Sequence, residues 1–420
     1  MAMKDYLGFL VNRVRERLWV RPLAACVLSV AAAFGAKAAD RAGLGQLVPQ
    51  IATESVEDLL AIMAASMLVI ATFAVASMVS AYASASSNAT PRAFALVVAD
   101  DVSQNALSTF IGAFIFSIVA LTAVKNDYFR TAGLFAVFVL TVVAFAVVIL
   151  TFVRWVDRIA RLGRLGATIE KVEKATEAAL GRRRAAPALH GVPAIPRQPQ
   201  GRPVFAARVG YVQRVDVPTL QACAEAARAR VAVVSLPGSF TFPGRPLAYV
   251  RAEAGGPDEI DCEGVADAFV IGKDRTFDED PRFGLVVLSE IAGRALSPAV
   301  NDPGTAIAII GSLARLFALW GASEKDSPAP ECDRVEVPEL SVRDMFDDAF
   351  TAIARDGAGT VEVAVRLQKA LEALASLGDA QMRDAAVAHA RMALARAERA
   401  LGLPEDVALV RDSAGFARAA

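Results

Sequence analysis

Long apolar runs alternate with short polar segments over the first 153 positions of the chain. A membrane-spanning helix needs about 20 apolar residues, because each residue rises about 1.5 Å and the hydrocarbon core is about 30 Å thick. The runs 102–124 and 131–153 are uncharged over 23 positions each, and only Lys125–Arg130 separates them. We therefore expect two spans that form a tight antiparallel hairpin. A further run, 59–91, is uncharged over 33 positions, and we expect 59–82 to lie in lipid.

The first apolar run, 22–36, has only 15 positions. It reaches the length of a span if it starts near Leu18 and the Arg21 side chain extends to the lipid headgroups. Its basic start and the segment Ala36-Lys37-Ala38 imitate a cleaved signal peptide. Because three further spans follow, we expect an uncleaved anchor instead. The sequence thus predicts a four-span, α-helical polytopic membrane domain over residues 1–153.

Lysine and arginine residues are unevenly distributed between the two sides of these spans. Cytoplasmic flanks are rich in Lys and Arg, so the richer side indicates the cytoplasm. One side holds 12 such residues and the other holds 4. This predicts a multi-pass protein in the lipid bilayer with both termini cytoplasmic. The richer side contains Lys4, Arg13, Arg15, Arg17, Arg21, Arg92, Arg154, Arg158, Arg161, Arg164, Lys171 and Lys174, and the poorer side contains Lys37, Arg41, Lys125 and Arg130.

The composition agrees with a membrane protein and excludes several other classes. Hydrophobic residues make up 55% of the 420 residues and charged residues 21%, whereas soluble domains have about 25% charged residues. Disorder and a surface-charged cytosolic enzyme are therefore excluded. The net charge of −1 argues against a nucleic-acid partner. The four cysteines form no Cys-x-x-Cys pair and the two histidines are far apart, so we expect no metal site and no cofactor.

The cores of the expected spans carry hydroxyl groups but no ionisable residue. The lack of ionisable groups argues against a proton relay, but not against a passive pore. In the run 59–91, Ser66, Ser77 and Ser84 are 11 and 7 positions apart, and Ser80 lies on the same helical stripe. One interpretation is close helix packing through small residues. The other is a pore lined by these four serines.

Residues 154–420 are expected to form a cytoplasmic α+β region. Positions 154–181 predict a stalk-like helix with nearly a coiled-coil seam, which either packs on its own domain or associates with a second copy. A Pro-rich linker with a solvated basic triplet is expected over 182–203. A small β-rich domain is expected over 204–272 and a helical cytoplasmic domain over 273–420. The seam consists of Trp155, Ile159, Leu162, Gly166, Ile169, Val172 and Thr176.

Within the helical domain, the pattern predicts helices over 283–296 and 305–320, a polar linker over 324–337, and three helices over 340–403 with breaks near two glycines. The joint between the first two helices has explicit capping chemistry. Asp302 is suited to cap the second helix, and proline at 303 suits its first position. On the first helix, glutamate at 290 and arginine at 294 are four apart and can pair.

The sequence of this joint resembles a known family. The segment Arg294-Ala295-Leu296-Ser297-Pro298-Ala299-Val300-Asn301-Asp302-Pro303-Gly304-Thr305-Ala306 is similar to the signature of the bacterial predicted membrane proteins catalogued as domain of unknown function 2254. The segments Asp280-Pro281, Phe283-Gly284 and Gly210-Tyr211-Val212-Gln213 fit the same family more weakly. The resemblance implies this architecture and a location in the bacterial inner (plasma) membrane, but no reaction. It makes Asn301 and Asp302 candidates for ion binding or a subunit contact, among the candidate residues Glu290, Arg294, Ser297, Asn301, Asp302 and Thr305.

The sequence contains no recognisable catalytic pattern. It has no Walker A motif, no Gly-x-Ser-x-Gly elbow and no acid–base constellation, so we expect that the chain is not an enzyme. We expect a homo-oligomeric channel or pore for ions or small solutes, with a cytoplasmic domain that gates it or forms a vestibule. The alternative is a non-conducting membrane scaffold or sensor whose cytoplasmic domain binds a ligand or protein partner.

Overall fold

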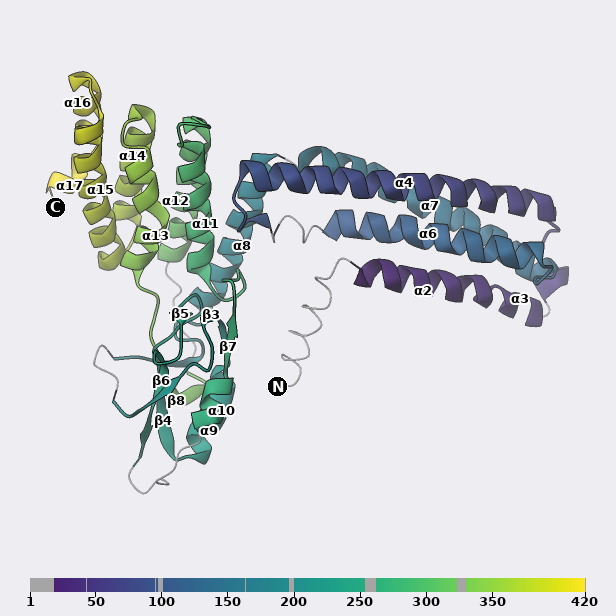
Figure 1. Ribbon diagram of the computed structural model, residues 1–420, viewed down its shortest axis with the longest axis horizontal. Coiled ribbons are helices and arrows are strands. Elements are labelled where there is room, and N and C mark those ends of the chain that lie inside the picture. Colours follow the sequence, from purple (N-terminus) through teal and green to yellow (C-terminus); the bar gives the residue numbers. More distant parts are fainter. Residues whose placement is uncertain are drawn as a thin grey trace. The chain divides into compact units, whose positions relative to one another are not determined.

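The structure is a computed structural model that describes residues 19–42, 44–94, 96, 101–162, 164–195, 200–253, 262–322 and 330–419 (Figure 1). These residues fall into two compact units, Met1–Thr168 and Ile169–Ala420. Each unit is described by itself. Four basic residues of the expected cytoplasmic flank and the expected start of the first span lie outside the described residues; they are Lys4, Arg13, Arg15, Arg17 and Leu18.

The first unit consists of long helices that run side by side (Figure 1). The expected hairpin of the last two spans is confirmed, because one helix ends at Lys125, the next begins at Thr131, and the two pack together. The elements of this unit are α2 (Val20–Gly35), α3 (Lys37–Arg41), the 3-10 helix η1 (Leu44–Gln46), α4 (Thr53–Asn88), α6 (Asp101–Lys125) and α7 (Thr131–Leu162).

Five helical segments among the described residues are long and apolar enough, by length and composition, to cross a membrane. Four of them contain the four runs expected to span. The fifth is α12 (Pro303–Gly321), which belongs to the second unit, so the expected number of four differs from the number of candidates. The five segments are Val20–Arg41, Thr53–Ser84, Asp101–Lys125, Thr131–Arg161 and Pro303–Gly321.

Helix α6 lies at the centre of the first unit and packs against α2, α4 and α7. Trp155 is fully buried, with its ring 6.2 Å from that of Phe110 and 6.0 Å from that of Phe152. Large apolar side chains therefore fill the interior of this unit, as close packing requires. They include Leu60, Met63, Met67, Phe110, Phe116 and Trp155.

Polar contacts tie α2 and α3 to the two ends of the helix bundle. Arg21, which is expected to extend to the headgroups, pairs with Asp101 and donates from Nη1 to Asn105 Oδ1 at 2.9 Å. These contacts fix the start of α2 to the start of α6. Beyond the other end of α2, Asp40 of α3 accepts hydrogen bonds from the first turn of α7, including the N–H of Gly133 at 2.6 Å.

The stalk-like helix expected over 154–181 is two helices. Helix α7 ends at Leu162, and α8 spans Leu165–Ala185. The seam is also divided, since Trp155 belongs to the core of the first unit, whereas Val172 and Thr176 are buried in the second. The seam residues Trp155, Val172 and Thr176 therefore pack on their own chain, and self-association through the rest of the seam stays a prediction.

The second unit contains a five-stranded sheet with the order β1-β8-β4-β6-β2 and a three-stranded sheet with the order β5-β3-β7. Valines at 231 and 233 alternate with outward residues and belong to the apolar core under the larger sheet. Helix α9 (Val217–Ala226) packs against β4 and β8, and α10 (Cys262–Asp267) packs against α9. The strands are β1 (Gly191–Pro193), β2 (Arg202–Phe205), β3 (Gly210–Val215), β4 (Ala229–Val233), β5 (Phe240–Thr241), β6 (Pro246–Ala252), β7 (Phe269–Gly272) and β8 (Cys332–Val337).

The sheets extend beyond the expected β-rich segment 204–272. The expected linker 182–203 contains the end of α8, all of β1 and the start of β2, while its prolines 196 and 199 lie outside the described residues. The expected polar linker 324–337 contains β8, which pairs in parallel with both β1 and β4. These pairings join β8 to strands about 140 and about 100 positions away, so local sequence patterns do not reveal them.

The remaining helices pack as two adjoining rows (Figure 1). In one row α13 lies between α11 and α15, and in the other α14 lies between α12 and α16. The three helices expected over 340–403 are confirmed, and the breaks fall at Gly357 and Gly378. The helices are α11 (Pro281–Ala295), α12, α13 (Val342–Asp356), α14 (Val361–Leu377), α15 (Ala380–Ala400), α16 (Pro404–Ser413) and α17 (Phe416–Ala419).

Candidate functional site

The four serines expected on one stripe of the second span lie on α4, outside the fully buried core. Ser66, Ser77 and Ser84 are half-buried, and Ser80 is exposed. The Ser66 hydroxyl donates to the backbone carbonyl of Ile62 at 2.8 Å, so it is already satisfied by its own helix. The serine stripe therefore lies along the edge of the exposed side of α4, which is called here its open side. The buried side is formed by apolar residues that include Leu60, Met63, Met67, Ala74 and Met78.

Several buried polar side chains of the first unit lie on α6 and α7, where the sequence analysis proposed none. Ser108, Ser117 and Thr141 each donate to the backbone carbonyl four residues earlier at 2.7 Å. Their hydrogen-bonding capacity is used within their own helices. The sequence did not indicate these residues because both lipid and the protein interior are apolar, so the buried side of a span has no distinctive composition.

The expected joint between two helices connects α11 and α12, and the predicted cap is confirmed. The Asp302 carboxylate accepts the backbone N–H of Thr305 at 3.1 Å and the Thr305 hydroxyl at 2.6 Å. These two hydrogen bonds, the hydroxyl first, hold the pKa of Asp302 below its usual value. At the end of α11, the Ser297 hydroxyl donates to the carbonyl of Arg294 at 2.7 Å. The three candidates Ser297, Asp302 and Thr305 thus have structural roles at helix ends.

The other candidates of this joint lie close by in an exposed turn and on α11. Asn301 has a φ of +50°, a left-handed conformation that asparagine tolerates better than most residues. The N–H of Asp302 donates to the carbonyl of Ala295 at 2.8 Å and closes the turn. Glu290 is half-buried and Arg294 is exposed. The structure thus brings the six candidates into one helix–turn–helix, and ion binding or a subunit contact at Asn301 and Asp302 stays a prediction.

A charged cluster that the sequence analysis did not identify holds the start of α11. The Asp280 carboxylate is buried and pairs with Arg275 through two hydrogen bonds, of 2.7 and 3.0 Å. It also caps α11 by accepting the N–H of Phe283 at 3.2 Å. Burial raises the pKa of Asp280, and the Arg275 guanidinium opposes that shift. The signal present in the sequence is Asp-Pro at 280–281, which repeats the cap of α12.

The basic triplet expected in a solvated linker is instead docked on the second unit. Arg183 is only 3% exposed, and its Nη2 donates to the carbonyl of Pro338 at 3.0 Å. Burial lowers the pKa of Arg183 to about 10. Arg182 and Arg184 also donate to backbone carbonyls of the same unit. The expectation of a solvated triplet is therefore wrong for Arg183, because α8 continues through these residues and places this side chain inside, whereas Arg182 is exposed.

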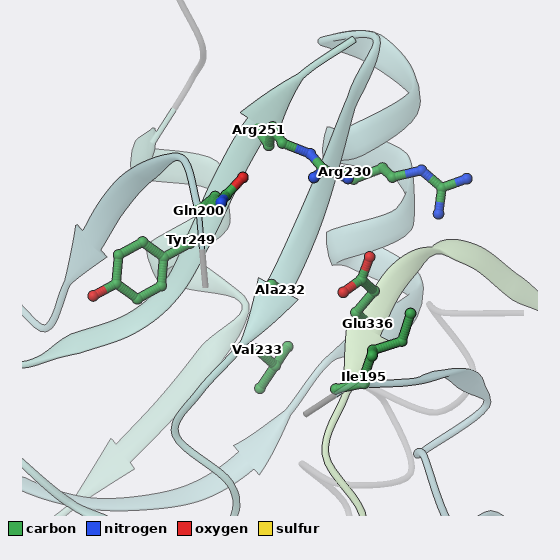
Figure 2. Close-up of a pocket in the computed structure, with 9 residues that line it drawn as sticks. Ile195, Gln200, Arg230, Ala232, Val233, Tyr249, Arg251 and Glu336 are labelled. Carbon is green, nitrogen blue, oxygen red and sulfur yellow. The ribbon is translucent and has the colours of Figure 1, made fainter. Parts of the chain in front are cut away.

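A pocket of about 50 Å³ lies on one face of the five-stranded sheet (Figure 2). Neighbouring strands β4, β6 and β8 contribute residues to it, and Gln200 contributes from the chain before β2. The lining combines two guanidinium groups with a carboxylate, an amide and a phenol. Its polar side chains are Gln200, Arg230, Tyr249, Arg251 and Glu336.

The two histidines have different surroundings. His389 is buried on α15, with Nδ1 at 2.9 Å from the carbonyl of Ala385 and Nε2 at 3.0 Å from Asp347 Oδ1. His190 is exposed, and its Nδ1 is 4.0 Å from the exposed Glu331 carboxylate. Within the described ranges, no group of three or more His, Cys, Asp or Glu residues could hold a metal ion.

Comparisons with known proteins place the chain among predicted membrane proteins. Among curated proteins it is similar to "Uncharacterized protein Rv1290c" of Mycobacterium tuberculosis and "Uncharacterized protein Mb1321c" of Mycobacterium bovis, each 39% identical over 114 residues. The similarity covers 26% of this chain and spans 22% of the length of each relative. No solved structure matches. A family model matches residues 15–373, and the chain therefore belongs to the family described as Predicted membrane protein (DUF2254).

Proposed function

We propose that this chain is the subunit of a homo-oligomeric membrane pore for ions or small solutes, with α4 lining the pathway. The observation that carries the proposal is the open side of α4, where small and hydroxylated residues are exposed among large apolar ones such as Val69 and Phe73. Spacings of 7, 4, 4 and 3 positions separate the exposed residues Ala65, Thr72, Ala76, Ser80 and Ala83.

Small residues at these spacings let the backbones of two membrane helices approach closely. Several copies of α4 can therefore surround a common axis. Ser66, Ser77 and Ser84, at the edge of this side, would supply oxygens that replace part of the water around a permeating solute. The apolar filling of the first unit supports a pathway between protomers rather than within one.

We propose that four segments span the membrane and that the second unit, including α12, lies in the cytoplasm. Arg315 lies within α12, and its Nε is 2.7 Å from the Glu173 carboxylate. Ile309, Leu313 and Phe317 of the same helix are buried within the second unit. A helix that is already covered and ion-paired gains little from lipid. The excess of Lys and Arg beside the spans supports cytoplasmic termini and the bacterial inner membrane as the location.

The experiment that tests the pore is recording from purified protein in planar bilayers, with cysteine modification of α4. In a cysteine-free background, Ser80→Cys would be treated with a water-soluble methanethiosulfonate reagent. We expect modification to reduce the conductance of this variant, because the reagent narrows the pathway. Val143→Cys is the matched control, since Val143 is 54% exposed on α7 and should face lipid. We expect its conductance to be unaffected.

Three results would contradict the proposal. The first is the absence of conductance at all voltages, pH values and salt compositions. The second is an equal response of Ser80→Cys and Val143→Cys to the reagent, which would show that α4 does not line the pathway. A symmetric assembly whose central axis is sealed by α4 side chains would also contradict the proposed pore.

The pocket on the five-stranded sheet favours a second candidate function, a non-conducting sensor whose cytoplasmic unit binds a ligand. Two arginine side chains in one pocket are typical of a site that recognises a carboxylate or a phosphate. In either function we propose no catalysis, because Asp280 and Arg275 are used in capping and in a mutual ion pair. Ligand binding without conductance would favour the sensor.

A further inference from the structure

We propose that the pocket on the five-stranded sheet, called here the arginine pocket and formed around Arg230, Arg251 and Tyr249, binds a small oxyanion group, a phosphate or carboxylate. The inference does not depend on conduction, and it holds for either candidate function. The same chemistry is offered by a free anion, by the end of a larger metabolite and by a lipid headgroup.

The strand register brings the polar groups of the arginine pocket to one face. Arg230 of β4 is the direct partner of Arg251 of β6, and Ala232 is the partner of Tyr249. Ala232 also pairs with Glu336 of β8. Alternate residues of a strand point to the same side of a sheet. One face of the sheet therefore carries these five residues, Arg230, Ala232, Tyr249, Arg251 and Glu336 (Figure 2). The small Ala232 side chain lies between the polar groups and leaves space above the sheet.

Within the described part of the chain, protein groups balance the charges of this face only in part. Like charges directly opposite each other in an antiparallel pair are destabilising, and Arg230 and Arg251 occupy such positions. Glu253 is shared, with its carboxylate 3.4 Å from Arg230 Nε and 2.9 Å from Arg334 Nη1. Among the residues that the structure describes, the side chain of Arg251 has no hydrogen bond and no ion pair. An anion at Arg251 would relieve the repulsion between the two arginines.

The size and shape of the arginine pocket define the class of ligand. A guanidinium group presents parallel N–H donors that match the two oxygens of a carboxylate or phosphate. The cavity, with a volume of about 50 Å³, has room for such a head group. Glu336 on the rim disfavours a second negative group nearby, so a single oxyanion fits better than a polyphosphate. Gln200 and Tyr249 can donate additional hydrogen bonds.

The test is titration calorimetry on the full chain in detergent, with inorganic phosphate and succinate as probes. We expect saturable binding that weakens with added salt. Arg251→Gln should raise the Kd about tenfold or more, because a hydrogen bond to a charged group is lost. Arg251→Lys should raise it by a smaller factor, since the charge stays but the paired donors are lost. Arg208→Gln is the control, because Arg208 is exposed outside the arginine pocket, and its Kd should equal that of the wild type.

A second arm separates soluble ligands from lipid. In nanodiscs, phosphatidylglycerol in place of phosphatidylcholine should raise the Tm of the wild type but not of Arg251→Gln if the anion is a headgroup. The proposal is overturned if neither probe binds saturably and the two lipids give equal Tm values. It is also overturned if Arg251→Gln binds the probes as tightly as Arg208→Gln. Arg251→Gln should remain folded, because removing one of two opposed arginines should leave the ligand-free Tm unchanged or higher. A weaker binding of the probes by this variant therefore reports on the arginine pocket and not on a loss of folding.

Discussion

The backbone of Gly238 lies directly against the carboxylate of Asp280, and no Cβ fits between them. Gly238 has a φ of +92° and donates its N–H to the carbonyl of Val212 at 2.8 Å. Asp280 caps α11 and pairs with Arg275. The first Pro-Gly turn of the β-rich region is therefore locked onto the start of the helical region.

We expect Gly238→Ala to destabilise the protein more than Gly244→Ala. Both glycines follow a proline and have similar φ values, +92° and +99°, but a Cβ on Gly244 meets nothing within 4 Å. The shared backbone strain costs about 1–2 kcal/mol in each variant. Displacement of Asp280 adds about 1–3 kcal/mol in Gly238→Ala only. Thermal unfolding of the two purified variants measures the difference, and equal Tm values would show that the Asp280 contact contributes nothing.

A second prediction concerns the clip between α3 and α7 in the first unit, by which we mean the hydrogen bonds from Arg130 and Gly133 to Asp40. Asp40 accepts the N–H of Gly133 at 2.6 Å and the N–H of Arg130 at 2.8 Å, and its side chain is 5% exposed. Asp40→Ala leaves both donors without this acceptor, so we expect a loss of about 1–3 kcal/mol. Asp40→Asn keeps one carbonyl oxygen and should lose less. The measurement is thermal unfolding in detergent, with the exposed Asp58→Ala as the control.

The same clip predicts the effect of adding a methyl group at Gly133. A Cβ there would lie 2.5 Å from Asp40 Oδ2, which forces the carboxylate to move. We expect Gly133→Ala to lower the Tm about as much as Asp40→Ala, and the double variant to be less destabilised than the sum, because both remove one interaction. Gly35→Ala is the control, since a Cβ on Gly35 meets nothing within 4 Å. Additive losses would show that the two residues act independently.

A third prediction follows from the Glu279 carboxyl group. Burial raises its pKa from 4.5 to about 7, although Arg214 Nε lies 3.3 Å away and opposes the shift. Between these two values the folded chain holds a proton that the unfolded chain releases. Folding stability from this group is therefore greatest below the unfolded pKa and falls as the pH rises through about 7. The side chain retains 31% exposure, so water reduces the effect and only its direction is predicted.

Thermal unfolding of wild type and Glu279→Gln between about pH 5 and pH 8 measures this effect. Glutamine imitates the neutral carboxyl at every pH, so we expect the Tm of the wild type to fall relative to the variant as the pH rises. Glu372→Gln, at an exposed position of α14, should follow the wild type. Parallel profiles for wild type and Glu279→Gln would contradict a raised pKa.

Local patterns in the sequence predict elements whose causes are local. The apolar runs predict the long helices of the first unit, and Asp302 predicts the start of α12, because a cap needs only residues three positions apart. In the same way, Asp280 followed by proline indicates the start of α11. These features follow from composition and short spacing alone.

Features that depend on distant residues were not predictable. Strand β8 lies in a polar segment, and only its pairing with β1 and β4 makes it a strand. Arg183 is basic and lies next to a Pro-rich stretch in the sequence. It is nevertheless buried, and it donates a hydrogen bond to the carbonyl of Pro338, which is distant in the sequence. The candidate site shows the same limit. The serines of α4 were identified by spacing, but their position at the edge of the buried side depends on α6 packing against α4.

The last prediction concerns the pair His389 and Asp347, which joins α15 to α13. Both ring nitrogens of His389 face oxygen acceptors, the carbonyl of Ala385 at 2.9 Å and Asp347 Oδ1 at 3.0 Å, and the ring lies 5.6 Å from that of Phe346. The His389 side chain is 4% exposed, whereas that of Asp347 is 51% exposed. Truncating the histidine therefore leaves a cavity, but truncating the aspartate exposes its site to water.

We expect His389→Ala to lower the free energy of unfolding by about 2–4 kcal/mol and Asp347→Ala by about 0.5–1.5 kcal/mol. His389→Gln should recover part of the loss, because glutamine fills space and can donate to Asp347. Denaturant unfolding of the three variants and the double variant gives the coupling between the two residues. Losses of equal size for the two alanine variants would mean that the hydrogen bond, and not the packing of the buried ring against Phe346, is the main contribution of His389.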